Sequence, residues 1–100
     1  ASLLENMVAI NLIRKYKNEV CFYHNGVEVD FYLPEQKKLI QASYSLQDES
    51  TFQRETEALI KVSKRLEVND LMIITKDEET VLEKDGKTIQ VVPLWKWLLG

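Results

Sequence analysis

The feature that most restricts the fold is a short, almost wholly apolar run at residues 71–75, directly after an amphipathic helical pattern. The run reads Leu-Met-Ile-Ile-Thr and shows no alternation of polar and apolar residues. A run of this length and composition indicates a strand that is covered on both faces. The sheet therefore needs a layer on each side, and we expect an α/β or α+β protein.

Hydrophobic periodicity predicts helices and strands along the rest of the chain. In order, they are a helix over 2–17, strands over 20–24, 27–33 and 38–44, a helix over 50–68, the strand over 71–75, strands over 81–83 and 88–92, and a short helix after Pro93. The second helix connects two strands, which predicts that these two are parallel. Since the other strands are joined by short turns, the sheet is expected to be mixed.

Local patterns predict the helix caps and the strand faces. The spacings Ser2-x-x-Glu5 and Ser50-x-x-Gln53 are typical of capping boxes and predict both serines as N-caps. Asn25-Gly26 and Asp85-Gly86 are predicted hairpin turns with positive φ at both residues. Alternation along 27–33 predicts an apolar face with Val27, Val29, Phe31 and Leu33. The opposite, polar face has Glu28, Asp30 and Tyr32. The second helix is predicted to bury Phe52, Thr56, Leu59, Ile60, Ser63 and Leu66, and to pair Glu57 with Lys61 on its outer face.

The composition describes one domain without an overall basic charge. The chain has 100 residues, and 13 Lys and Arg against 16 Asp and Glu give a net charge of −3. DNA-binding domains usually carry a basic stripe, so this balance argues against nucleic-acid binding as the main role. Two basic clusters are interpreted as solvated helix faces: Arg14, Lys15 and Lys17, and Lys61, Lys64 and Arg65. Cys21 lies in an apolar run and is interpreted as a small core residue.

Targeting and cofactor patterns limit the functional classes. No apolar run approaches the roughly 20 residues of a membrane helix, and no signal-peptide pattern is present, so we expect a cytoplasmic protein with no membrane partner. The chain starts without Met, directly in a helix pattern, and is expected to be a fragment of a longer protein. It contains three Gly and no Walker signature, so this segment is not expected to bind ATP. Trp95 and Trp97 cannot both be buried by one helix face, and the exposed one is expected to contact a partner.

Polar residues gather on the strands over 27–33 and 38–44. Gln41 and Ser43 are two residues apart, so their side chains share a face, and strand pairing would bring Asp30 to them. Glu28 lies on the same predicted face as Asp30, and Glu5 lies early in the first helix. Simpler explanations exist for the acids: Glu5 completes a capping box, and Glu28 and Asp30 fit the solvent side of an amphipathic hairpin.

The order and spacing of several segments resemble a known family. The segments are Ser-Leu-Leu-Glu-Asn at 2–6, Gly-Val-Glu-Val-Asp-Phe at 26–31, Leu-Ile-Gln-Ala-Ser-Tyr-Ser-Leu at 39–46, Gln-Arg-Glu-Thr-Glu-Ala-Leu at 53–59, Met-Ile-Ile-Thr at 72–75, and Val-Pro-Leu-Trp-Lys-Trp-Leu-Leu at 92–99. Together they resemble the domain of unknown function that follows the ATPase module in many prokaryotic AAA ATPases. That domain is similar to the PD-(D/E)XK nuclease superfamily. The resemblance implies one restriction-endonuclease-like domain over 1–100, with a mixed central sheet flanked by helices.

The resemblance also implies a degenerate nuclease site. The family pattern has an acid on the first helix, an Asp on the second strand, and an acid-x-Lys signature on the third. Glu5 and Asp30 match the first two, whereas Gln41 replaces the acid and Ser43 replaces the Lys. Asp30, Gln41 and Glu5 are the candidate ligands of Mg²⁺ or Mn²⁺, although the loss of a carboxylate weakens a site for hard cations. Without the Lys, the site lacks a cation that stabilises charge on phosphate.

Three functions remain open at this point. The first is a non-catalytic C-terminal accessory domain of an AAA ATPase, active in domain docking, oligomer contacts or weak contact with DNA or RNA, with ATP bound only by the ATPase module. The second is a metal-dependent nuclease based on Glu5, Glu28 and Asp30, with a lysine such as Lys38 supplied from elsewhere. The third is a nucleic-acid-binding module without chemistry.

Overall fold

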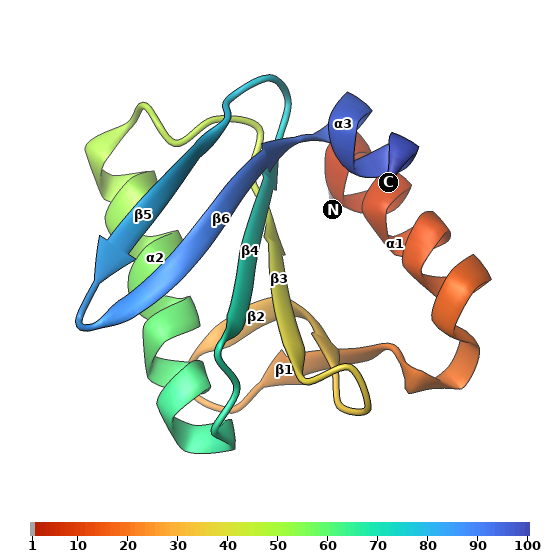
Figure 1. Cartoon of the computed structure of the whole chain (residues 1–100), viewed down its shortest axis with the longest axis horizontal. Helices are drawn as coiled ribbons and strands as arrows, with labels where there is room; N and C mark the ends of the chain where they lie inside the picture. The colour runs from red at the N-terminus through yellow and green to blue at the C-terminus, as the bar shows by residue number, and fades with distance from the viewer. Residues whose placement is uncertain (1) are drawn as a thin grey trace.

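A six-stranded mixed sheet lies between helices in the computed structural model, which describes residues 2–100 (Figure 1). The elements in chain order are α1 (Leu3–Tyr16), a 3-10 turn (Lys17–Glu19), β1 (Cys21–His24), β2 (Glu28–Leu33), β3 (Lys38–Ala42), α2 (Glu49–Leu66), β4 (Asp70–Thr75), β5 (Thr80–Lys84), β6 (Lys87–Pro93) and α3 (Leu94–Leu99). The predicted elements are all present. Within residues 2–100, no helix combines the length and apolarity that crossing a membrane requires.

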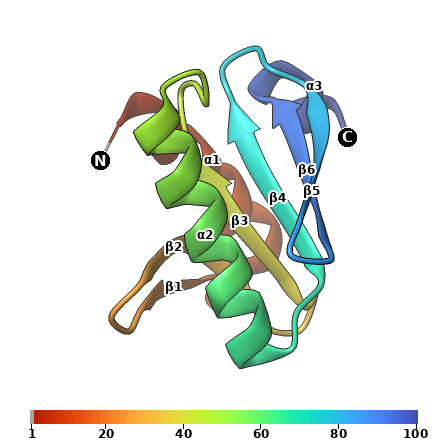
Figure 2. The ribbon, with the colours of Figure 1, turned by 90° about the vertical axis from the view of Figure 1, so that its left-hand side faces the viewer.

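The strand order is β1-β2-β3-β4-β6-β5. The three central strands β3, β4 and β6 are parallel, and antiparallel partners continue the sheet to both edges. The predicted parallel pairing across α2 is therefore confirmed. Helix α2 covers one face of the sheet, and α1 and α3 lie on the other, as the two views of Figures 1 and 2 agree. This mixed architecture was expected, and at this level it is consistent with a restriction-endonuclease-like arrangement.

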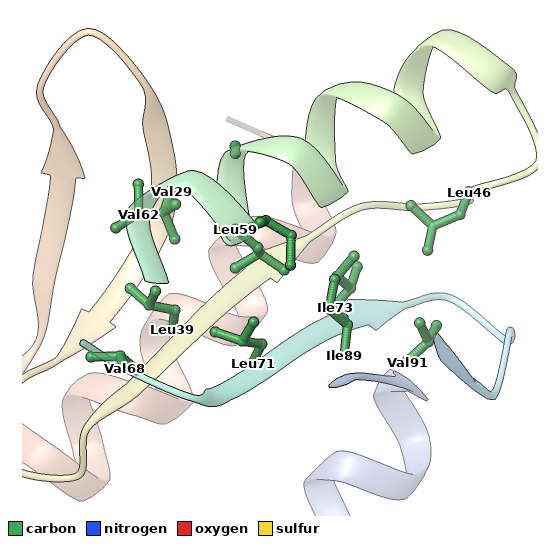
Figure 3. Packing of buried hydrophobic residues seen from close by; sticks show 12 residues of the cluster. Val29, Leu39, Leu46, Leu59, Val62, Val68, Leu71, Ile73, Ile89 and Val91 are labelled. Atoms are coloured by element: carbon green, nitrogen blue, oxygen red, sulfur yellow. The ribbon is translucent and has the colours of Figure 1, made fainter. Parts of the chain in front are cut away.

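Two hydrophobic clusters fill the space on either side of the sheet. The cluster under α2, shown in Figure 3, includes Leu59 and Val62 of the helix together with Leu39, Leu71 and Ile73 of the sheet. The cluster under α1 contains residues of this helix and strand residues on the opposite face of the sheet: Leu4, Val8, Leu12, Phe31, Leu33, Ile40, Ala42 and Ile74. Strand β4 contributes Ile73 to one cluster and Ile74 to the other, as expected for an apolar strand buried on both faces.

A β-bulge in β2 changes the predicted faces of this strand. Cys21 pairs with Tyr32 but Tyr23 pairs with Val29. Two residues of β2, Asp30 and Phe31, therefore lie opposite one residue of β1, Phe22. Val27 and Val29 consequently pack in the α2 cluster, whereas Phe31 and Leu33 pack in the α1 cluster. The predicted single apolar face is therefore wrong. An extra residue shifts the two-residue period of a strand, and bulges occur often next to functional sites.

Several local predictions also need correction. Ser2 caps α1 as expected, since its hydroxyl accepts the Glu5 N–H at 3.1 Å. The cap of α2 is Asp48 and not Ser50, because the Asp48 carboxylate accepts the N–H of Thr51 and also the hydroxyl of Ser50. The stripe that α2 buries also includes two residues that were not predicted, Ala58 and Val62.

The first hairpin and its cysteine differ from expectation as well. The pair of His24 with Glu28 closes the β1–β2 hairpin, which leaves a three-residue loop in which Gly26 has a φ of 76° while Asn25 is not at positive φ. Cys21 is exposed and not part of the core, because β1 is an edge strand whose residues are mostly exposed. Trp95 is exposed and Trp97 is half-buried, in line with the expectation for the last helix.

The β5–β6 turn gives a direct test of backbone strain. Asp85 and Gly86 have φ of 51° and 74°, as predicted for a two-residue hairpin turn. A Cβ at Gly86 would meet no atom within 4 Å, so Gly86→Ala should destabilise through the left-handed backbone alone, by about 1 kcal/mol. Gly86→Asn should cost clearly less, since Asn tolerates this region. Urea unfolding of both variants measures the difference, and equal losses would contradict this account.

Candidate functional site: a polar cleft between β2, β3 and α2

Side chains replace backbone pairing where β2 and β3 diverge. The ladder between the two strands runs from Leu33 and Lys38 to Phe31 and Ile40. At the next position, the side-chain Oε1 of Gln41 accepts the backbone N–H of Asp30 at 2.8 Å. In the reverse direction, Oδ2 of Asp30 accepts the backbone N–H of Ala42, also at 2.8 Å. These two hydrogen bonds hold the strands together while opening the space between them.

Gln41 also links this point to helix α2. Its side chain is 1% exposed, and its Nε2 donates a longer hydrogen bond of 3.5 Å to the backbone carbonyl of Glu55. A buried amide needs partners for both its oxygen and its nitrogen. The Asp30 N–H of β2 donates to the oxygen of Gln41, and the Glu55 carbonyl of α2 accepts from its nitrogen. Gln41, a residue of β3, therefore fixes the three elements relative to one another.

A cleft of about 430 Å³ opens beside this network. Its charged lining comes from β2 and from one face of α2, and consists of Glu28, Asp30, Arg54, Glu55, Glu57 and Lys61, with Gln41 at the base. Arg54 and Glu55 are neighbours in an ion pair of 3.5 Å between Nε and Oε2. Four carboxylates against two cations give the cleft a negative character.

Burial and neighbouring carboxylates disfavour the charged form of two acids. The pKa of Asp30 is raised from 3.8 to about 6. Burial is the main cause, the carboxylates of Glu5 and Glu28 add to it, and the hydrogen bond from the Ala42 N–H opposes it. Burial also raises the pKa of Glu55, and Asp30 adds to this effect, while Arg54 opposes it. Since Glu5 raises the pKa of both groups, the acid of α1 lies within electrostatic reach of the cleft.

The structure brings together only part of the predicted site. Asp30 and Gln41 are adjacent, as expected from strand pairing. Glu5 acts on Asp30 through its charge but does not line the cleft. Ser43 follows the end of β3, and its hydroxyl donates to the carbonyl of Ser45 at 3.0 Å, so it does not join the cleft. Lys38 lies elsewhere, 3.9 Å from the carboxylate of Asp70, and the suggestion that it completes the site is wrong.

Helix α2 contributes more to the cleft than its sequence suggested. The sequence predicts an ion pair between Glu57 and Lys61 on the outer face of the helix, and it places Glu55 only within the segment at 53–59 that carries the family resemblance. All three line the cleft, and no ion pair joins Glu57 to Lys61 within the part of the chain described. Arg54, Ala58 and Lys61 follow the three- and four-residue spacing of one helix face, which is the pattern that could have revealed this face.

Two of the oxygens that the sequence predicts as metal ligands are already hydrogen-bonded. Among residues 2–100, no three His, Cys, Asp or Glu side chains are arranged to hold a metal. The oxygen of Gln41 and one oxygen of Asp30 already accept backbone N–H groups. Hard cations such as Mg²⁺ need several oxygen ligands, so a metal held by these two oxygens would compete with both hydrogen bonds.

Comparisons with protein-family models, curated proteins and solved structures give no match to this chain. The function of the cleft must therefore be inferred from the geometry of its own residues.

Substitution of Gln41 tests its structural role. Gln41→Ala leaves the Asp30 N–H without its acceptor and creates a cavity, so we expect a loss of about 2–4 kcal/mol in the free energy of unfolding. Gln41→Met preserves most of the side-chain volume and removes only the hydrogen bonds, so we expect a loss of about 1–2 kcal/mol in the free energy of unfolding. Urea unfolding at neutral pH provides the measurement. Wild-type stability in Gln41→Met would show that these hydrogen bonds contribute nothing.

Asp30 should make stability depend on pH. Its pKa is raised to about 6 in the folded protein, so the folded state binds the proton more tightly than the unfolded chain. The free energy of unfolding should therefore rise as pH falls from about 7 to about 4. Below the pKa values of Asp30 in the folded and in the unfolded state, its contribution to stability is constant. Asp30→Asn keeps an acceptor for the Ala42 N–H and removes the charge. We expect it to gain about 1 kcal/mol at pH 7.5, after allowing for solvent screening of a half-buried group.

The control for this pH series is Asp77→Asn, which removes an exposed carboxylate on the loop after β4. Denaturant unfolding at several pH values gives the free energy of unfolding as a function of pH. Between pH 4 and 7, this dependence should be weaker than in the wild type only in Asp30→Asn. Part of the slope should remain, since the pKa of Glu55 is raised as well. A slope unchanged by Asp30→Asn would be incompatible with this assignment.

Proposed function

We propose that this chain is a non-catalytic accessory domain of an AAA-type ATPase, in which a nuclease-like site serves as part of the framework. The observation that carries the proposal is the reciprocal pair of hydrogen bonds between Asp30 and the Gln41–Ala42 segment. By the resemblance to PD-(D/E)XK domains, Gln41 occupies the position of a metal-binding acid. Its amide instead holds β2, β3 and α2 together, a role that requires both its oxygen and its nitrogen.

The chemistry expected of a nuclease supports the same proposal. The position of the family lysine is Ser43, and the hydroxyl of this residue donates to a nearby carbonyl outside the cleft. Loss of one general base or electrostatic group typically costs about 10² to 10⁴ in rate. Both the acid and the lysine of the family pattern are missing, so the cleft lacks the two groups that this pattern uses to bind a metal and to stabilise charge on phosphate.

Docking is the role left for a domain of this kind. Trp95 is 59% exposed on the short helix α3, and exposed aromatic residues are common anchors of protein contacts. We propose that the domain contacts the ATPase module, with ATP bound and hydrolysed in that module and not here. Reading the coding sequence upstream of residue 1 tests this context, because the proposal requires a P-loop module there.

A metal-dependent nuclease is the second candidate, and one observation favours it. The carboxylate of Asp30 raises the pKa of Glu55, and the carboxylate of Glu5 raises the pKa of both groups. A divalent cation bound by these acids would reduce the repulsion between their carboxylates. In this case Arg54 and Lys61 are the cations of the cleft that would face a phosphate.

Cleavage assays separate the two candidates. Purified protein is incubated with supercoiled DNA, single-stranded DNA and RNA in the presence of Mg²⁺ or Mn²⁺, beside Asp30→Asn as the control. This variant keeps the hydrogen bond to Ala42, so its fold is expected to survive. We expect no difference between the two proteins. Metal-dependent cleavage by the wild type that disappears in Asp30→Asn would establish the nuclease and end the non-catalytic proposal.

A gain-of-site variant sharpens the metal test. Gln41→Glu with Ser43→Lys restores the acid-x-Lys pattern of the sequence, and Glu at position 41 keeps an oxygen for the Asp30 N–H while it loses the donor to the Glu55 carbonyl. We expect Mn²⁺ to raise the midpoint of thermal unfolding of this double variant, by linkage between binding and folding, and to leave the wild type unchanged. A similar Mn²⁺-dependent shift in the wild type would favour the second candidate.

A further inference from the structure

A groove of about 560 Å³ lies on the face of the sheet opposite the acidic cleft. It runs between α1 and α3, which lie on the same side of the sheet in Figure 1. Its floor is apolar and comes from both helices and from four strands: Leu12, Leu33, Ile40, Met72, Val92 and Trp97. Met72, Val92 and Trp97 are only partly buried, so apolar surface remains open to solvent between the helices.

The charged residues of this groove are all basic. Arg14, Lys15, Lys38 and Lys96 line it, and no Asp or Glu side chain does so among the residues described. This contrasts with the whole chain, in which 16 acids outnumber 13 basic residues. Lys38 contacts Asp70 and Lys96 contacts Glu79, whereas Arg14 and Lys15 have no acidic partner within residues 2–100. The groove therefore presents positive charge above an apolar floor.

Apolar surface continues from the groove along both helices. Among residues 2–100, seven of the ten large exposed hydrophobic residues belong to α1 and α3, namely Leu3, Met7, Ile10, Ile13, Trp95, Leu98 and Leu99. Met7 and Ile10 precede Arg14 by seven and four residues, which places them on the same side of α1 as this lining residue. Exposed apolar residues spread along two helices exceed what a small ligand covers, which favours a protein contact.

We infer that the groove between α1 and α3 binds an acidic amphipathic helix of a partner protein. An amphipathic helix can place apolar side chains on the floor while its flanking acids face Arg14 and Lys15, as in other helix-in-groove contacts. A second copy of this chain fits less well, because a two-fold pairing through the groove would bring the same cations together. The inference deepens the docking role proposed above and is independent of the acidic cleft.

The test is a selection of displayed peptides of about three to four helical turns against the purified protein. The library should contain amphipathic peptides with acidic, basic or neutral flanks in equal number. We expect acidic amphipathic peptides to be enriched. Their binding, measured by fluorescence anisotropy, should weaken about tenfold or more in Arg14→Glu/Lys15→Glu, and should fall with rising salt. Met72→Trp fills the floor and should abolish binding.

The matched control is Lys64→Glu/Lys76→Glu, which makes the same change in charge at two exposed positions outside the groove. This control should bind the selected peptides as the wild type does, and circular dichroism verifies the fold of each variant. Failure to enrich any peptide, enrichment of basic or neutral ones, or acidic peptides that are insensitive to the groove variants would each overturn the inference. A dimer in sedimentation that Arg14→Glu/Lys15→Glu dissociates would instead make a second copy the occupant.

These results are distinguishable from a failure of the proposed function. Metal-dependent cleavage at the cleft would remove the non-catalytic assignment whatever the groove binds. Absence of peptide binding would remove the groove as a docking surface and leave that assignment intact.

Discussion

The reciprocal hydrogen bonds of Asp30 and Gln41 are the interaction on which the rest of the structure depends. They join β2 to β3 where the backbone ladder stops, and they allow the two strands to separate without leaving unpaired polar groups. The bulge at Asp30 and Phe31 moves β2 from one hydrophobic cluster to the other at the same point. The second bond of Gln41 brings the backbone of α2 to this position. The cleft and the burial of Asp30, which raises its pKa, follow from this local arrangement.

The sequence predicted the architecture better than its details. The apolar strand before Thr75, the Asp85-Gly86 turn and the helix between two strands each depend on short-range patterns, and the structure confirms them. The faces of β2 were predicted wrongly because strict alternation assumes a regular strand, and one extra residue reverses it. Cys21 was misplaced because an apolar run does not reveal whether its strand lies at an edge of the sheet.

The candidate site could be predicted only where it lies within one hairpin. Pairing of two adjacent strands is enough to bring Asp30 to Gln41. Ser43 was expected beside them, but β3 ends at Ala42 and the alternation ends with it. The contribution of Lys61 and its neighbours depends on how α2 crosses the sheet, which is set by packing of side chains far apart in the chain. A helical charge pattern shows that such a face exists, but not what the face covers.

The distribution of charge explains why net charge is a poor guide to the partners of this domain. The sheet separates two surfaces, so acids gather at the β2–α2 cleft while basic residues surround the groove between α1 and α3. A total charge of −3 averages over both. At physiological ionic strength, charges more than about 8 Å apart are largely screened, so a partner responds to the surface it touches and not to the sum. An acidic partner can therefore approach an acidic protein, provided that it docks on the face where no acid lines the groove in the part of the chain described.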